Sequence, residues 1–210
     1  SMAIDRDTLA GTFGVPRWRS ADRLLPAQLD SASPPVAPVW AGNTLAERQA
    51  AARAQVAEWT RARGSIEPLR VALPAGPGMR ILFARVAADW RAIGVPAVLV
   101  AFDAKDADLR LIDEVAPNAS ANWYLTRTGC DFALPCAFDA DAALKASRAA
   151  PSFAARAVLI GQADAAQAKA PAFIPLARPV RWSLVDPALE GFHENAFATH
   201  PLAELVVRAQ

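Results

Sequence analysis

The clearest alternation of apolar and polar positions lies between residues 69 and 102. Leu69–Leu73, which lies between Pro68 and Pro74, and Ala97–Phe102 are short apolar runs that are typical of buried strands. Between them, apolar residues recur at the spacing of one face of a helix. A helix that joins two buried strands predicts a right-handed crossover with parallel strands, and therefore an α/β core. The predicted helix is Met79–Ile93, and its predicted buried positions are Leu82, Phe83, Val86 and Trp90.

The first 64 residues are predicted to form a short helix, an extended arm and an outer helix. Asp5 or Asp7 is placed to cap the short helix. Residues 15–40 hold five prolines and few periodic positions, which predicts a proline-rich extended arm laid over a surface. Thr44-Leu45-Ala46-Glu47 is a capping box, and the helix that follows has a thin apolar side, which favours an outer position.

The pattern after the crossover predicts a third strand and a group of helices. Leu109–Ile112 is the strand candidate, and Ser152 is placed to cap a helix. Two apolar runs on either side of Arg178 are predicted as strands or as an extended hairpin. Together these elements predict an α/β fold with a mixed, partly parallel sheet and flanking helices. The remaining predicted elements are the helices Ser120–Arg127 and Asp139–Ala149, a helix after Ser152 with Phe153, Val158, Leu159 and Ile160 inward, the runs Ala172–Leu176 and Val180–Val185, and a final helical turn at Leu202–Val207.

Length and composition indicate one globular domain, or one large domain with an appendage. At 210 residues and 53% hydrophobic content, the chain can bury a core and is too apolar to be disordered. We expect residues 1–64 to form the N-terminal helix, arm and outer helix, residues 65–186 the α/β core, and residues 187–210 a C-terminal segment. With 22 basic and 21 acidic residues, the net charge of +1 gives no reason to expect a nucleic acid partner.

Targeting and membrane signals are absent from the sequence as given. No run of about 18 apolar residues is present, so we expect no membrane-spanning helix. The residues from Ser1 to Arg6 show neither the basic region nor the apolar region of an export signal.

Sequence motifs for catalysis and cofactor binding are mostly missing. Gly76-Pro77-Gly78 follows a strand and opens a helix, but it lacks the further glycine or the Gly-Lys-Ser/Thr of a phosphate loop. No Gly-x-Ser-x-Gly sequence is present. We therefore expect no cofactor and no metal ion. Asp113 and Glu114 follow the third strand, where ligands of open α/β sheets bind, so either carboxylate is a candidate ligand contact or general base.

Two cysteines, Cys130 and Cys136, lie in one predicted loop. Their spacing favours a disulfide, which would stabilise so short a loop by roughly 2 kcal/mol and would indicate an oxidising compartment. Free thiols, or a zinc site with His193 and His200, are the alternatives.

Three segments resemble one protein family. LRVALPAGPGMRILFARVAADWRAIGVPAVLV, residues 69–100, is similar to a strand, helix and strand in the C-terminal lobe of cluster-5 bacterial extracellular solute-binding proteins. Ala3-Ile4-Asp5-Arg6-Asp7-Thr8-Leu9 resembles a segment earlier in that lobe. Arg181-Trp182-Ser183-Leu184-Val185, with Gly191-Phe192 and Asn195, resembles the closing segment. These proteins are the peptide-, dipeptide- and nickel-binding components of ABC importers.

The resemblance implies a fold, a function and partners. It implies one lobe of a two-lobed, exported receptor that closes around its ligand without catalysis. The implied partners are a missing N-terminal lobe, toward which residues 187–210 lead, an ABC importer permease, and a small solute such as a peptide. The implied location is the periplasm.

Position in the fold predicts where the ligand binds. Side chains at the end of the third strand and in the helix after it face the cleft that a second lobe would close, with a carboxylate or an aromatic ring available to hold a ligand cation. Two other classes of function remain open: a small α/β enzyme that uses Asp113 or Glu114 as general base, and an adaptor domain without a small ligand. The predicted ligand contacts are Asp113, Glu114, Asn118, Asn122 and Trp123.

Overall fold

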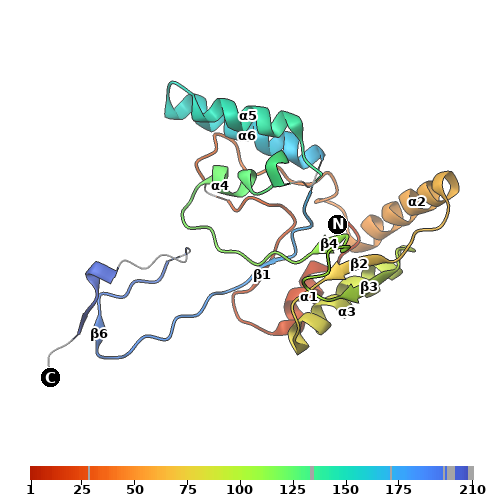
Figure 1. The fold of residues 1–210 in the computed structure, drawn as a ribbon, viewed down its shortest axis with the longest axis horizontal. Helices are drawn as coiled ribbons and strands as arrows, with labels where there is room; N and C mark the ends of the chain where they lie inside the picture. The colour runs from red at the N-terminus through yellow and green to blue at the C-terminus, as the bar shows by residue number, and fades with distance from the viewer. Residues whose placement is uncertain (28, 133–134, 171, 196, 198–201, 208–210) are drawn as a thin grey trace. The chain divides into compact units, whose positions relative to one another are not determined.

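The structure is a computed structural model that describes residues 1–27, 29–132, 135–170, 172–195, 197 and 202–207 (Figure 1). The chain folds into two compact units, and each is built from segments that are distant in sequence. The proline-rich arm is divided between them. Unit 1 comprises Ser1–Asp22, Ala37–Asp113 and Ile174–Pro179, and unit 2 comprises Arg23–Val36, Glu114–Phe173 and Val180–Gln210.

Unit 1 is built on a parallel sheet of three strands. β2 (Leu69–Ala72) lies in the centre, with β3 (Ala97–Val100) on one side and β4 (Leu109–Arg110) on the other. Both pairs are parallel, and Val71 is in register with Leu99 of β3 and with Leu109 of β4. The predicted crossover between parallel strands is confirmed. The strands are shorter than predicted: β3 ends at Val100, before Phe102, and β4 ends at Arg110, before Leu111.

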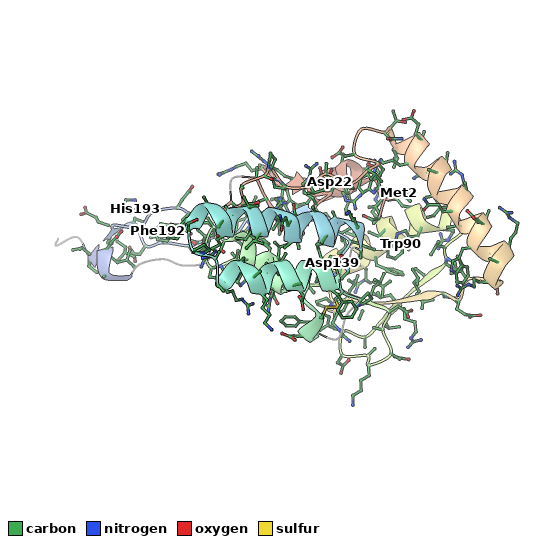
Figure 2. All side chains as sticks on the ribbon, turned by 90° about the horizontal axis from the view of Figure 1, so that it is seen from above. Met2, Asp22, Trp90, Asp139, Phe192 and His193 are labelled. Atoms are coloured by element: carbon green, nitrogen blue, oxygen red, sulfur yellow. A yellow bond between two sulfur atoms is a disulfide. The ribbon has the colours of Figure 1, made fainter. Side chains whose placement is uncertain are left out.

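Helix α3 (Pro77–Arg91) forms the crossover and covers the core of unit 1. Pro77 occupies the first helical position, where its missing N–H removes no helical hydrogen bond. Val86 and Trp90 are buried as predicted, and Figure 2 labels Trp90 on this helix. Leu82 and Phe83 pack against the same core and are partly buried, so their predicted burial is confirmed only in part.

The two N-terminal helices begin where their predicted capping residues lie. Helix α1 (Arg6–Phe13) has Asp5 as its N-cap, whose side chain accepts from the N–H of Thr8. Helix α2 (Leu45–Arg63) begins at the predicted capping box of Thr44 and Glu47. Only Ala52 of α2 is buried, so the predicted outer position of this helix is confirmed.

A small antiparallel sheet in unit 1 corrects the prediction for residues 172–185. β1 (Arg19–Ser20), from the proline-rich arm, pairs with β5 (Ala177–Arg178). Residues 180–185 form no strand, and no hairpin joins them to residues 172–176. Pro175 and Pro179 flank β5, and proline has no N–H to donate to a ladder, which explains why the strand is so short.

Unit 2 is a helical assembly. Helices α4 (Ala121–Thr126), α5 (Phe138–Arg148) and α6 (Phe153–Lys169) pack together, and Figure 1 shows α5 and α6 side by side. Ser152 caps α6 as predicted, and its side chain accepts from the N–H of Ala155. The core of unit 2 consists of Leu25, Ala121, Leu125, Ala140, Leu144, Ile160 and Ala163.

The predicted inward face of α6 is only partly correct. Ile160 is fully buried, whereas Phe153 is 89% exposed and Val158 is 50% exposed. Ile160, Ala163 and Gln167 form the buried stripe at helical spacing. Val158 is two residues from Ile160 and therefore lies on another face, and Phe153 is the first residue of the helix.

The C-terminal part of unit 2 forms a small hairpin instead of a helical turn. β6 (Leu189–Glu190) pairs antiparallel with β7 (Val206–Val207), and a 3₁₀ turn, η2, covers Leu202–Glu204. The predicted helix at 202–207 is therefore wrong after residue 204. A Cβ at Gly191 would clash with the backbone carbonyl oxygen of Glu204, so glycine is required for this close approach. Among the described residues, no helix has the length and apolar character needed to span a bilayer.

Candidate ligand-binding site

Glu114 and Arg127 form the central ion pair of the predicted site in unit 2. The Nε–H of Arg127 donates to Glu114 Oε2 at 2.8 Å, and a second guanidinium N–H donates to the same oxygen. The hydrogen bond to Glu114 raises the pKa of Arg127 above its usual value. Both side chains are about 40% exposed. The carboxylate of Glu114 is therefore neutralised by a cation of the same unit.

Two aromatic rings surround the Arg127 guanidinium. Its central carbon lies 5.5 Å from the ring centre of Trp123 and 5.8 Å from that of Phe132. Trp123 also makes an edge-to-face contact with Tyr124, with the ring centres 5.0 Å apart. We call Glu114, Trp123, Arg127 and Phe132 the Arg127 cluster. It presents a neutral ion pair and partly exposed aromatic surface.

The remaining predicted site residues differ in their surroundings. Asn118 is exposed, and Asn122 lies on α4 with a buried side-chain oxygen that has no hydrogen-bond partner. Asp113 is exposed at the end of the sheet segment and belongs to unit 1. Of the five predicted ligand contacts, Glu114 and Trp123 are the two that lie in the Arg127 cluster. That any of the five contacts a ligand remains a prediction.

Sequence reasoning missed Arg127 and Phe132. Trp123 and Arg127 are four residues apart, the spacing at which side chains of a helix meet. The contact between them could therefore have been predicted from the sequence. Phe132 lies in a 3₁₀ turn, η1 (Cys130–Phe132), and no sequence periodicity links it to α4.

The disulfide predicted from the cysteine spacing is confirmed. Cys130 and Cys136 are bonded, which closes the loop that begins with η1. The backbone N–H of Cys130 donates to Asp141 Oδ2 of α5 at 3.2 Å. A Cβ at the neighbouring Gly129 would lie 2.9 Å from the other carboxylate oxygen of Asp141, so a larger residue here would displace the Asp141 side chain. The loop is therefore fixed at one end to α5.

In the structure, Cys130 and Cys136 are neither free thiols nor zinc ligands. Both sulfur atoms are bonded to each other, so neither is a thiolate ligand. His193 is exposed in the C-terminal segment, where Figure 2 labels it, and His200 lies outside the described residues. Within the described part of the chain, no three His, Cys, Asp or Glu side chains are grouped to hold a metal ion.

Two open hollows lie elsewhere in the described residues. One is beside α1 in unit 1, where Asp7, Gly14 and Trp18 contribute to its wall. The other, in unit 2, lies where the start of α5 meets the end of α6, at Phe138 and Lys169. Neither is lined by a predicted ligand contact.

Comparison with solved structures gives matches over nearly the whole chain. Haemophilus influenzae OppA in complex with RPPGFSPFR matches with a TM-score of 0.82 and 15% identity, over 99% of this chain and 44% of that chain. Burkholderia pseudomallei OppA matches with a TM-score of 0.80 and 19% identity over the same shares. The Escherichia coli murein tripeptide binding protein MppA matches with a TM-score of 0.75 and 16% identity, over 100% of this chain and 44% of that chain.

These matches confirm the fold that the sequence motifs predicted. No family model and no curated protein sequence matches the chain, so the likeness is one of structure. The chain spans 44% of the length of each of these three proteins. Another match is described as a periplasmic murein tripeptide binding protein in its unliganded open form. The chain therefore has the fold of part of the solute-binding proteins that its motifs resemble.

Proposed function

We propose that the chain is the ligand-binding lobe of a periplasmic substrate-binding protein of an ABC importer, and that its ligand is a peptide or a similar small solute. The observation that supports this most is the match of 99% of the chain to an OppA that was solved with a bound peptide. The three sequence motifs, which are independent of that comparison, favour the same class of protein.

The proposed role is binding without catalysis. A general base needs a carboxylate that is free to accept a proton, and Glu114 is paired with Arg127. The neighbouring aromatic rings instead favour contact with a ligand side chain. We propose Asp113, Glu114, Asn118, Asn122 and Trp123 as the residues from which ligand contacts are drawn, with Glu114 contributing through its ion pair with Arg127.

The proposed partners follow from the share of the matching proteins that the chain spans. A clamp buries its ligand between two lobes, and closure supplies much of the contact. One lobe offers only part of the contacts but still bears the cost of immobilising the ligand. We therefore propose an N-terminal lobe in the same polypeptide and an importer permease as partners.

Calorimetry tests the proposal. The 210-residue chain and the product of the complete gene are titrated with a panel of peptides and divalent metal ions. We expect measurable peptide binding by the complete product and weak or no binding by the isolated chain. Trp123→Ala in the complete product should weaken binding about tenfold or more, because one aromatic contact is removed. Trp182→Ala, which removes a 79% exposed ring, is the matched control.

Two results would contradict this function. Turnover of a substrate by the isolated chain would replace the binding lobe with an enzyme. Equal affinity of the isolated chain and the complete product would replace the clamp with a self-contained binding domain.

A further inference from the structure

Helix α4, which carries Asn122 and Trp123, has little intrinsic stability. It has only six residues, and isolated helices shorter than about 12 residues are marginal in water. Its N-cap residue is Ser120, yet the Ser120 side chain makes no capping hydrogen bond to the helix. The first N–H groups of such a helix need acceptors from elsewhere.

Asp30 of the proline-rich arm supplies an acceptor from 91 residues away. Its Oδ1 accepts from the backbone N–H of Ala121 at 2.6 Å, and its Oδ2 accepts from the hydroxyl of Ser120 at 3.3 Å. A carboxylate at this end also interacts favourably with the helix dipole. Arg156 of α6 lies 3.6 Å from Asp30 Oδ2, so one carboxylate joins the arm, α4 and α6.

The arm segment that carries Asp30 is itself fixed to unit 2 at several points. Leu25 is 1% exposed in the core. The N–H of Ala32 donates to the carbonyl of Ala157 at 3.1 Å, and the N–H of Val36 donates to Asp164 Oδ2 at 2.8 Å. The segment also crosses α6 at Gly161, where a Cβ would lie 3.2 Å from Ser33 Oγ. We call residues 23–36 the strap.

We propose that Asp30 is a positioning residue of the ligand-binding site: held by the strap, it caps α4 and thereby fixes the orientation of Asn122 and Trp123. This inference rests on the proposed function, because it assigns Asp30 an effect on residues that are proposed to contact the ligand. Asp30 acts through α4 and touches no ligand. Part of the proline-rich arm, the strap, would thus hold α4 in place.

Amide hydrogen exchange of the 210-residue chain tests the positioning role without a ligand. In Asp30→Ala, the amides of Ala121, Asn122 and Trp123 should exchange roughly tenfold faster, the scale of losing an N-cap, while amides of α5 keep their rates. Asp30→Asn keeps an oxygen acceptor and should restore most of the protection. Asp139→Ala, which removes an exposed carboxylate from the first turn of α5 (Figure 2), is the matched control and should leave α4 unchanged.

A spectroscopic signal reports on the side chain itself. The indole N–H resonance of Trp123, assigned with Trp123→Phe, should shift or broaden in Asp30→Ala and keep its position in Asp139→Ala. Unchanged exchange of α4 in Asp30→Ala overturns the proposal. Equal acceleration throughout unit 2 also overturns it, because Asp30 would then act on global stability. Exchange in Asp30→Asn as fast as in Asp30→Ala excludes the acceptor role.

Peptide affinity separates this inference from the proposed function. In the complete gene product, Asp30→Ala should weaken peptide binding about three- to tenfold, with Asp30→Asn close to the unsubstituted protein. If that protein binds no peptide, the proposed function fails, while the exchange result still decides whether Asp30 fixes α4. If peptide binds and Asp30→Ala leaves the affinity unchanged, the positioning role is wrong and the proposed function stands.

Discussion

The two units differ in where their organising contacts come from. In unit 1, a contiguous segment forms β2, α3, β3 and β4, and its own apolar residues supply much of the core. In unit 2, three helices from the middle of the chain depend on the strap for a core leucine and for the cap of α4. Local pattern therefore determines the β2–α3–β3–β4 segment of the first unit, while α4 of the second unit needs a partner that is 91 residues away in sequence.

Truncation of the unit 1 core should have the largest effect. Trp90 is 6% exposed and packs against residues of the sheet, so Trp90→Ala should lower the free energy of unfolding by about 3–5 kcal/mol. Urea denaturation followed by circular dichroism measures this loss. Ile81→Ala, at a 45% exposed position of the same helix, is the control and should cost less than about 1 kcal/mol. Equal losses in the two variants would show that α3 does not bury its Trp90 face.

Shortening a buried side chain of the strap should lower the free energy of unfolding almost as much. Leu25→Ala removes a fully buried side chain from the core of unit 2 and should cost about 2–5 kcal/mol. Val39→Ala, in the same proline-rich arm but 100% exposed, should have almost no effect. A loss below about 1 kcal/mol for Leu25→Ala in the same denaturation experiment would mean that unit 2 folds without the strap.

The range of an interaction decided which parts of the fold were predictable. The helix caps at Asp5, Thr44 and Ser152 join residues three apart, and the β2–α3–β3 crossover follows from apolar spacing within one segment. By contrast, the pairing of β1 with β5 joins segments near opposite ends of the chain, and its register cannot be predicted from either segment alone.

The candidate site was predictable only in part, for the same reason. Position after the third strand identified Glu114 and Trp123, and helical spacing connects Trp123 to Arg127. The contact of Phe132 with Arg127 depends on the path of the chain from α4 into η1, and the role of Asp30 depends on the path of the strap. Neither path has a periodic pattern from which it could be predicted.

Loss of the disulfide should have an intermediate effect on unit 2. The bond closes a short loop, so replacing both Cys130 and Cys136 by serine should cost roughly 2 kcal/mol. Thermal unfolding of the double variant, compared with the oxidised and the reduced protein, measures this effect. Thiol titration of the unreduced, denatured protein should find no free thiol. Two titratable thiols would contradict the bond and remove a local argument for an oxidising compartment.

Replacing either of two carboxylates, Asp5 in unit 1 and Asp164 in unit 2, should change the free energy of unfolding least, and the two changes should have opposite signs. Burial raises the pKa of Asp164 in unit 2, although its bond from Val36 and the charge of Arg23 oppose the shift. Burial also acts to raise the pKa of Asp5 in unit 1, but hydrogen bonds from Thr8 and the charge of Arg48 lower it overall. The ionised form is therefore disfavoured by folding at Asp164 and favoured at Asp5.

The signs set the expected pH dependence of stability. Because the folded pKa of Asp164 lies above the usual 3.8, its destabilising effect is absent below that pH and develops as pH rises through the folded pKa. Asp164→Asn keeps an acceptor for the Val36 N–H, so it should be more stable than the unsubstituted protein at pH 7, by less than about 1 kcal/mol. This gain should vanish toward pH 3.8. Denaturant midpoints measured from pH 3 to 7 would follow it.

Asp5→Asn provides the opposite case. The folded pKa of Asp5 lies below 3.8, so its stabilising effect is complete above that pH and is lost as pH falls through the folded pKa. Asp5→Asn should therefore be less stable than the unsubstituted protein at pH 7, with a difference that shrinks below pH 3.8. If Asp164→Asn, like Asp5→Asn, were less stable than the unsubstituted protein at pH 7, the ionised Asp164 would stabilise the fold, and the Val36 hydrogen bond and the Arg23 charge would together outweigh the cost of its burial.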